Sequence, residues 1–292
     1  MGDRAAAGDM DAGERMSAES SNARIGGLRV LLYHAVAASL PLKLGWRERK
    51  FWMAAEEFRS HMALISSLAN PVLDLDRAWG AKSNARSPAS ILWPAAQPAP
   101  VVLTFDDGRA SDHSVVWPLV RDAGWSATFF VNTATLGKPG YLRWRDVREM
   151  SAGGALLASH GHRHVDFTAL APGALAIELR MSKDLIEGWT GRPVRFLAAP
   201  YGRVNQRVMD AALEAGYRAV CTSVPWPARA GAPSVSRVAI HATTGREELR
   251  RLIEGRPIPY WARQVRAACL SLPKRMVFRP AVERQILPDG AR

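Results

Sequence analysis

The chain has little cysteine and no long apolar run, and both deficits narrow its class. Its 292 residues include only two cysteines, Cys221 and Cys269, so no disulfide framework is expected. Because no apolar run reaches about eighteen residues, the sequence predicts no transmembrane helix. Residues 1–24 are small and polar and lack the apolar core of a secretory signal. Together these features predict a cytoplasmic protein.

The sequence also lacks an internal repeat, a glycine-rich phosphate loop and any recognised nucleic-acid-binding motif. A formal charge of +12 would suit a nucleic-acid partner, but without such a motif none is expected. Hydrophobic residues make up 48% of the chain, which is enough for a large core. Length and composition predict a disordered tail at 1–24, one catalytic domain at 25–255 and a basic extension at 256–292.

Short apolar segments alternate with helical patterns along the middle of the chain. The segments expected to form strands are 28–34, 100–105, 126–132, 154–159, 194–199, 218–223 and 234–240. Strands that alternate with helices pair in parallel, which predicts an α/β fold, here a distorted (β/α) barrel of about seven strands. In such a barrel the functional side chains lie at the carboxyl ends of the strands.

Two adjacent carboxylates, Asp106 and Asp107, follow the strand expected at 100–105 and precede Gly108. Neighbouring side chains on a strand point to opposite sides, so both acids can face one site only if the backbone turns there. Burying two carboxylates costs on the order of several kcal/mol unless a cation or hydrogen-bond donors compensate. The pair therefore predicts one metal-binding carboxylate beside one that transfers a proton, or else a plain Asp-Asp-Gly turn.

A histidine cluster follows another expected strand later in the chain. His160 and His164 come after the apolar segment 155–158, and their spacing places both imidazoles on one face of a helical turn. On that turn His162 points elsewhere. Two imidazoles and one carboxylate form a common open ligand set for a catalytic divalent metal. Clusters at two strand ends favour a metal site over a solvated surface turn.

These two segments resemble the first two motifs of the polysaccharide deacetylases of carbohydrate esterase family 4, and the resemblance extends over about 28–241. It implies that Asp106 is the general base. It also implies that Asp107, His160 and His164 hold a divalent metal, with Zn²⁺ the expected ion. The implied substrate is an N-acetylated glycan, from which a carbohydrate esterase of this family removes acetyl groups.

A third segment, Pro200, Tyr201 and Gly202, resembles the family motif in which the backbone after the proline helps to hold the oxyanion. Two positions depart from the family pattern. Ala198 stands where many members carry an arginine that orients the catalytic aspartate, and Trp226 is not preceded by the aspartate that often accompanies it. These departures leave the tuning of the base open, although the metal ligands are all present.

The general acid has two candidates. The family usually supplies a histidine from a Leu-x-His motif near its C-terminal end, whereas this chain has Leu32-Tyr33-His34 near its N-terminus. This order resembles the circularly permuted branch that deacetylates poly-N-acetylglucosamine. A barrel permits the permutation because its last strand neighbours its first. His34 is the preferred acid, and His241, which follows the strand expected at 234–240, is the alternative.

The resemblance and the residues together predict a metal-dependent hydrolase that removes N-acetyl groups from a polysaccharide, an oligosaccharide or a lipid-linked glycan. Two alternatives stay open. In the first alternative, the chain is a catalytically weakened homologue with a carbohydrate-binding or regulatory role. In the second, it hydrolyses another amide or C–N bond in a small molecule.

Residues 255–292 contain eight Lys or Arg and two acids, interleaved with apolar side chains. This pattern predicts either peripheral contact with an anionic membrane or a solvated helix face followed by a tail. The sequence does not decide between them, and it does not predict the oligomeric state.

Overall fold

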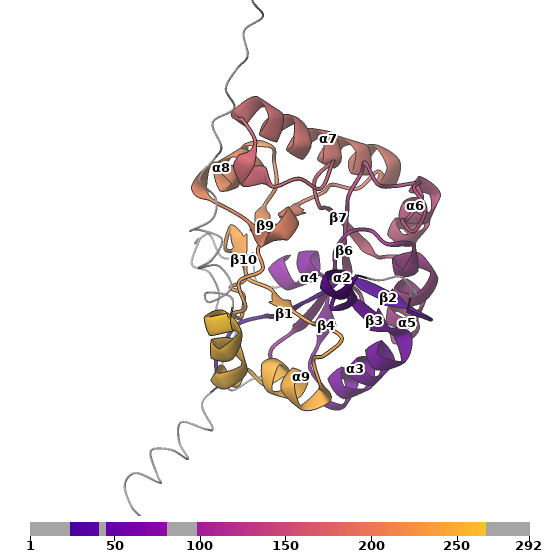
Figure 1. The fold of residues 1–292 in the computed structure, drawn as a ribbon, viewed down its shortest axis with the longest axis vertical. Helices are drawn as coiled ribbons and strands as arrows, with labels where there is room; N and C mark the ends of the chain where they lie inside the picture. The colour runs from indigo at the N-terminus through magenta and orange to yellow at the C-terminus, as the bar shows by residue number, and fades with distance from the viewer. Residues whose placement is uncertain (1–23, 41–44, 81–97, 267–292) are drawn as a thin grey trace, which may run out of the picture.

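The computed structural model describes residues 24–40, 45–80 and 98–266. Parallel strands form a curled sheet, and helices surround it as the chain runs around the barrel axis (Figure 1). Residues 1–23 of the predicted disordered tail at 1–24, and 267–292 of the predicted extension at 256–292, lie outside the described residues. Within the described ranges, no helix is long and apolar enough to cross a membrane.

The elements follow the expected alternation of strands and helices. The strands are β1 Arg29–Tyr33, β2 Ala35–Ala37, β3 Trp52–Ala54, β4 Val72–Leu73, β5 Val101–Phe105, β6 Thr128–Val131, β7 Leu156–Ser159, β8 Phe196–Ala198, β9 Ala219–Cys221, β10 Ser234–Val235 and β11 Val238–Ala239. The α-helices are α2 Trp46–Arg49, α3 Ala55–Ser67, α4 Leu75–Gly80, α5 Trp117–Asp122, α6 Trp144–Ala152, α7 Pro172–Thr190, α8 Gln206–Glu214 and α9 Arg246–Ile253. Further helical segments are η1 Asp112–Val116, η2 Phe167–Ala169, η3 Pro200–Gly202 and a last described helix at 257–266.

The main sheet has the strand order β10-β9-β8-β7-β6-β5-β1-β11, with β4 paired to β5. Every strand pair in it is parallel. The N-terminal strand β1 lies between β5 and β11, so the first and last parts of the domain are neighbours, as the permuted arrangement requires. The expected single strand at 234–240 was wrong in one respect: it is two short strands, divided at Ser236 and Arg237, that pair with opposite ends of the sheet.

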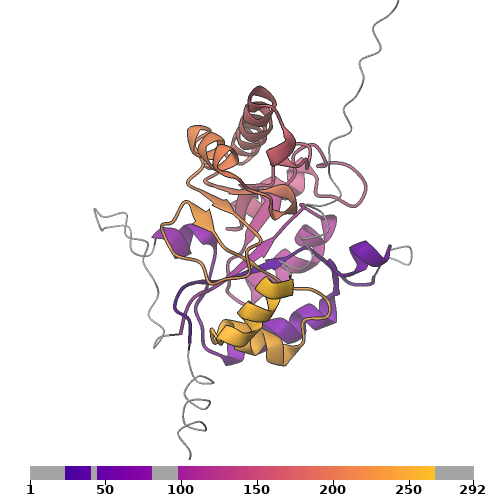
Figure 2. The same ribbon diagram turned by 60° about the vertical axis from the view of Figure 1, so that its left-hand side comes forward.

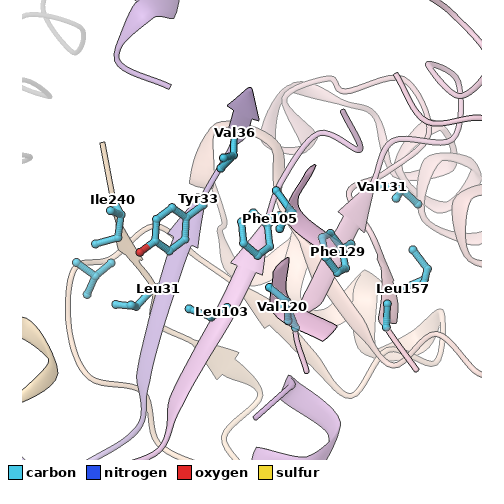
Figure 3. Packing of buried hydrophobic residues seen from close by; sticks show 14 of the residues in the cluster. Leu31, Tyr33, Val36, Leu103, Phe105, Val120, Phe129, Val131, Leu157 and Ile240 are labelled. Atoms are coloured by element: carbon cyan, nitrogen blue, oxygen red, sulfur yellow. The ribbon is translucent and has the colours of Figure 1, made fainter. Parts of the chain in front are cut away.

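Two buried clusters cover the two faces of the sheet. The larger contains residues of the surrounding helices together with Leu31, Tyr33, Leu103, Phe105 and Phe129, and Figure 3 shows these strand residues side by side. The smaller holds the alternate strand positions and side chains of α4, and it fills the inside of the curl. Because strand side chains alternate between faces, a residue that continues the inner series past a strand end points into the mouth of the barrel.

The outer helices enclose this sheet. Helices α3, α6, α7, α8 and α9 form the ring seen in Figure 1, and Figure 2 shows the last described helix, in yellow, crossing in front of the strands. That helix covers 257–266 and packs through the fully buried Tyr260, whose ring contacts Trp226 at a centroid distance of 5.9 Å. The described start of the predicted extension therefore lies against the domain.

Candidate functional site

Asp106 and Asp107 lie directly after β5, at its carboxyl end. Asp106 continues the inner series of that strand and is 3% exposed. Asp107 would point to the outer face of a regular strand, but its φ of +80° turns the chain there. Two adjacent acids can face one site only if the backbone turns, and this turn brings both carboxylates to the mouth of the barrel.

The histidine segment after β7 is a loop, so the predicted helical turn was wrong. Gly161 has a φ of +78° and His164 a φ of +56°, and neither angle belongs to a right-handed helix. A Cβ at Gly161 would lie 2.7 Å from the ring of Phe167, so the loop requires glycine there. The loop still brings His160 and His164 together, with ring centroids 5.0 Å apart.

A buried carboxylate holds this loop in place. Glu178 of α7 is fully buried and accepts hydrogen bonds from the backbone N–H groups of His162 and Arg163, at 3.0 and 2.9 Å. The side chain of Arg163 also pairs with it. The His162 ring turns away from the other two and hydrogen-bonds Thr133 at 2.8 Å, as expected.

Asp107, His160 and His164 form a cluster whose ligand atoms all lie within 4.8 Å of one another. The Oδ1 atom of Asp107 is 3.6 Å from Nε2 of His160 and 3.4 Å from Nε2 of His164. One carboxylate oxygen and two imidazole nitrogens that converge on one point suit a divalent transition metal and leave positions for other ligands. The residues present therefore fit the implied metal.

His160 is held in the tautomer that a metal requires. Its Nδ1 lies 2.8 Å from the carbonyl oxygen of Ala198, so Nδ1 carries the proton and donates it there. Nε2 is then free to bind a metal. Burial lowers the pKa of His160 by more than the neighbouring Asp106 and Asp107 raise it, which favours the neutral imidazole.

Arg237 occupies the interior beside Asp106. It donates from Nη1 to Oδ1 at 2.7 Å and from Nη2 to Oδ2 at 2.9 Å, in a two-bond contact, and its side chain is fully buried. Its Nε donates to the carbonyl of Thr222 at 3.2 Å, and its guanidinium lies over the ring of Phe130. Arg237 thus provides the arginine contact to Asp106 that Ala198 cannot make.

Both carboxylates of the pair have lowered pKa values. Burial alone raises the pKa of Asp106, but Arg237 and His160 outweigh that effect and bring it below its usual range. Burial likewise raises the pKa of Asp107, and the contact with His164 and the charge of His160 reverse the shift. Both side chains are therefore ionised at neutral pH, in the form that accepts protons or binds cations.

The two candidate acids lie in different surroundings. His34 follows β1, and burial lowers its pKa, while the charges of Asp106 and Asp107 oppose that shift and those of His160 and Arg237 add to it. His241 follows β11, and the groups that influence it are instead Arg263, Lys50, His34 and Arg266, so that burial and these charges lower its pKa to about 4. The ring of Phe51 contacts both histidines, at 4.6 Å from His34 and 5.7 Å from His241. The charges that act on His34 thus include those of the ligand cluster, whereas those that act on His241 come mainly from basic residues outside it.

The third motif lies beside the His164 ring. Pro200, Tyr201 and Gly202 form the short helix η3 after β8, and Tyr201 has a φ of +61°. The Tyr201 ring is 64% exposed and lies 5.0 Å from the ring of His164. This segment therefore borders the cluster at its solvent side.

Sequence reasoning missed Arg237 and Glu178. Arg237 interrupts an otherwise apolar strand pattern, and a cation at an inward position was the signal that could have revealed it. Glu178 lies in the apolar first half of α7, where a lone carboxylate among apolar residues is the equivalent signal. Neither residue belongs to the motifs that the sequence displays.

Comparison with known proteins agrees with this geometry. Residues 95–220 match the protein family described as polysaccharide deacetylase. The putative polysaccharide deacetylase YxkH of Bacillus subtilis (strain 168) is 24% identical over 198 residues, which cover 68% of this chain and 65% of YxkH. A chitin deacetylase of Arthroderma benhamiae is 28% identical over 129 residues, which cover 42% of this chain and 33% of that protein. The chain thus spans less than two thirds of the length of these relatives.

A solved structure shares the fold. The Streptococcus pyogenes deacetylase PplD, solved in complex with acetate, superposes with a TM-score of 0.67 at 22% identity, covering 79% of this chain and 99% of that one. The curled parallel sheet with its surrounding helices is therefore the α/β barrel of deacetylases. The family match and the relatives together show a polysaccharide deacetylase domain in this chain over residues 95–220.

Proposed function

We propose that this chain is a metal-dependent hydrolase that removes N-acetyl groups from an N-acetylated sugar within a polysaccharide, an oligosaccharide or a lipid-linked glycan. One observation carries the proposal. The three converging ligands Asp107, His160 and His164 lie beside an ion-paired carboxylate, Asp106, at the mouth of a polysaccharide deacetylase domain. The name of the chitin deacetylase relative supports an N-acetylated substrate.

Asp107, His160 and His164 would hold the metal, and Zn²⁺ suits their mixed nitrogen and oxygen set. When bound, such an ion polarises a carbonyl group and lowers the pKa of water. The fixed tautomer of His160 and the loop bonds of Glu178 keep the ligand atoms in place without rearrangement. The metal preference and the metal dependence belong to this proposal.

Asp106 is the proposed general base. It stays ionised because Arg237 binds both of its oxygens, and the same contact fixes the orientation of the carboxylate. His34, at the end of β1, is the proposed general acid that gives a proton to the leaving amine. The backbone N–H of Tyr201 would donate to the oxygen that gains charge.

The position of Arg237 removes the main argument for the alternative of a catalytically weakened homologue. It rested on Ala198 and on the missing aspartate before Trp226. Because Arg237 takes over the contact to Asp106, Ala198 no longer argues for a disabled base. Hydrolysis of another amide bond stays a second candidate, since a shared fold does not fix a substrate.

An acetate-release screen tests the proposal. We expect acetate from oligomers of N-acetylglucosamine and little from unrelated N-acyl amides. Exhaustive chelation should abolish that activity, and Zn²⁺ should restore it, with His160→Ala as a variant that no longer retains the metal. Acetate release that is unchanged in metal-free protein would overturn the metal assignment, and release only from other amides would favour the second candidate.

The remaining assignments are proposals of the same kind. We propose that 25–255 forms the catalytic domain and that the protein works in the cytoplasm. The basic region 256–292 would then reach an anionic membrane if the substrate is lipid-linked.

A further inference from the structure

The two oxygens of Asp107 have different partners. Oδ1 faces the imidazoles of His160 and His164, at 3.6 and 3.4 Å. Oδ2 accepts a hydrogen bond from Nη2 of Arg109 at 3.3 Å. The carboxylate is thus shared between the ligand cluster and a guanidinium on its other side.

Arg109 is held between two aromatic rings. Its guanidinium carbon lies 4.6 Å from the ring centroid of Tyr141 and 5.7 Å from that of Trp52. Its side chain is 26% exposed. Stacking of this kind contributes about 0.5–1 kcal/mol at a partly exposed site and restricts where the guanidinium can point. Arg109 therefore presents its N–H groups to Asp107 from a fixed direction.

The backbone around Arg109 is held by main-chain contacts of its own. Gly108 and Ala110 are bound to the segment 140–142 by main-chain hydrogen bonds of 2.9 and 3.0 Å. Arg109 and Tyr141 themselves form an antiparallel bridge. Because the loop is fastened through main-chain atoms, loop anchoring alone leaves the contact between the guanidinium and Asp107 unexplained.

We infer that Arg109 is a positioning residue that restricts Asp107 to coordinate the metal through Oδ1 alone. The inference rests on the proposed metal site. A free carboxylate can offer one or both oxygens to a metal, and an oxygen that accepts from a guanidinium is withheld. The same positive charge lies close to the ion and opposes it. Arg109 thus lowers the metal affinity and keeps one coordination position open, as a catalytic site needs.

Arg109→Gln tests the inference directly. Loss of the charge removes a repulsion and release of Oδ2 offers a second ligand atom, so we expect Zn²⁺ affinity, measured by competition with a chelator, to rise about tenfold. The visible absorption of the Co²⁺-loaded protein should weaken, because a second oxygen raises the coordination number. Turnover should fall while KM changes little. Arg109→Lys keeps the charge and should stay near the parent in Zn²⁺ affinity.

The chain offers a matched control in Arg121. It also pairs with an aspartate, Asp122, at 3.1 Å and lies over a tryptophan ring, that of Trp117, at 5.2 Å. Asp122 does not belong to the metal cluster, so Arg121→Gln should leave Zn²⁺ affinity and the Co²⁺ spectrum unchanged. Unchanged or weaker Zn²⁺ binding by Arg109→Gln, with a parent-like Co²⁺ spectrum, would overturn the role of Arg109. A parent protein that binds no metal would instead overturn the proposed function itself.

Discussion

Arg237 and Asp106 form a buried ion pair with two hydrogen bonds, although 131 positions separate them in the chain. The arginine enters the barrel between β10 and β11 and the aspartate follows β5, so the pair crosses the inside of the curled sheet. Each guanidinium nitrogen has a hydrogen-bond partner, which offsets the cost of burying the charge. The pair links the proposed base to the two strands that end the sheet.

Replacing Arg237 should therefore affect both stability and the base. Arg237→Gln leaves Asp106 buried without its counter-charge, which should lower the free energy of unfolding by about 3–5 kcal/mol in denaturant titrations. It should also raise the pKa of Asp106 and move the acidic limb of the pH–rate profile to higher pH. Arg237→Lys keeps a charge but loses the two-bond contact. Its free energy of unfolding should lie between those of Arg237→Gln and the parent, and so should its acidic limb.

The difference in unfolding free energy between the parent and Arg237→Gln should depend on pH in a defined direction. The pKa of Asp106 lies below its usual range, so the stabilisation is complete above about pH 4 and is lost as the pH falls through the folded-state value. The gap in unfolding free energy between parent and Arg237→Gln should accordingly be widest near neutral pH and should narrow in acid. A gap of constant size would show that packing, and not charge, dominates.

Asp106→Asn separates the two acids of the pair. The amide keeps the shape of the side chain but accepts no proton, so turnover should fall about a hundredfold or more. Metal content, measured by elemental analysis, should stay near that of the parent, because Asp107 and the two histidines are intact. If the variant instead loses its metal, Asp106 is a ligand and the proposed division of roles is wrong.

Substrates with different leaving groups can show whether His34 or His241 is the general acid. An amine cannot leave unprotonated, whereas the alkoxide or phenoxide of an activated ester needs little help from an acid. His34→Ala should lose most N-deacetylation and keep much of its activity on an activated acetyl ester, and His241→Ala should change both rates little. The reverse pattern would transfer the acid role to His241.

Asp112 should be a source of instability at neutral pH. It is fully buried in η1, and neither carboxylate oxygen has a hydrogen-bond partner among the described residues. Burial, and then the charge of Asp107, raise its pKa well above the usual value. Its neutral form is therefore favoured in the fold, and ionisation destabilises the protein as the pH rises from about 4 through the folded-state pKa.

Asp112→Asn removes this ionisation while keeping nearly the same volume. The variant should be more stable than the parent near pH 8, and its advantage should shrink toward pH 4 in thermal unfolding experiments. Asp122→Asn, at a solvent-exposed aspartate, provides the control and should show no such trend. An advantage that does not change with pH would contradict a buried neutral carboxyl group at Asp112.

The sequence alone determined the family, the α/β barrel and the candidate ligand residues. Local patterns were enough for these conclusions, because an apolar strand followed by paired acids or paired histidines can be recognised without knowing which residues lie across the barrel. Adjacent acids also required a backbone turn, and the positive φ of Asp107 supplies it. In contrast, the helical turn expected for His160 and His164 was wrong, because Gly161 and His164 adopt positive φ angles that spacing alone does not reveal.

Only the tertiary structure decided which distant residues support the site. Arg237 reaches Asp106 because the curled sheet places β11, which follows Arg237, only one strand away from β5, and Glu178 reaches the histidine loop because α7 packs over β7. The folded sheet also decides which charges act on the two candidate acids, those of Asp106 and Asp107 on His34 and mainly basic ones on His241. Such contacts depend on strand order and on the direction of each side chain inside the barrel, and these are properties of the folded sheet that no local pattern encodes.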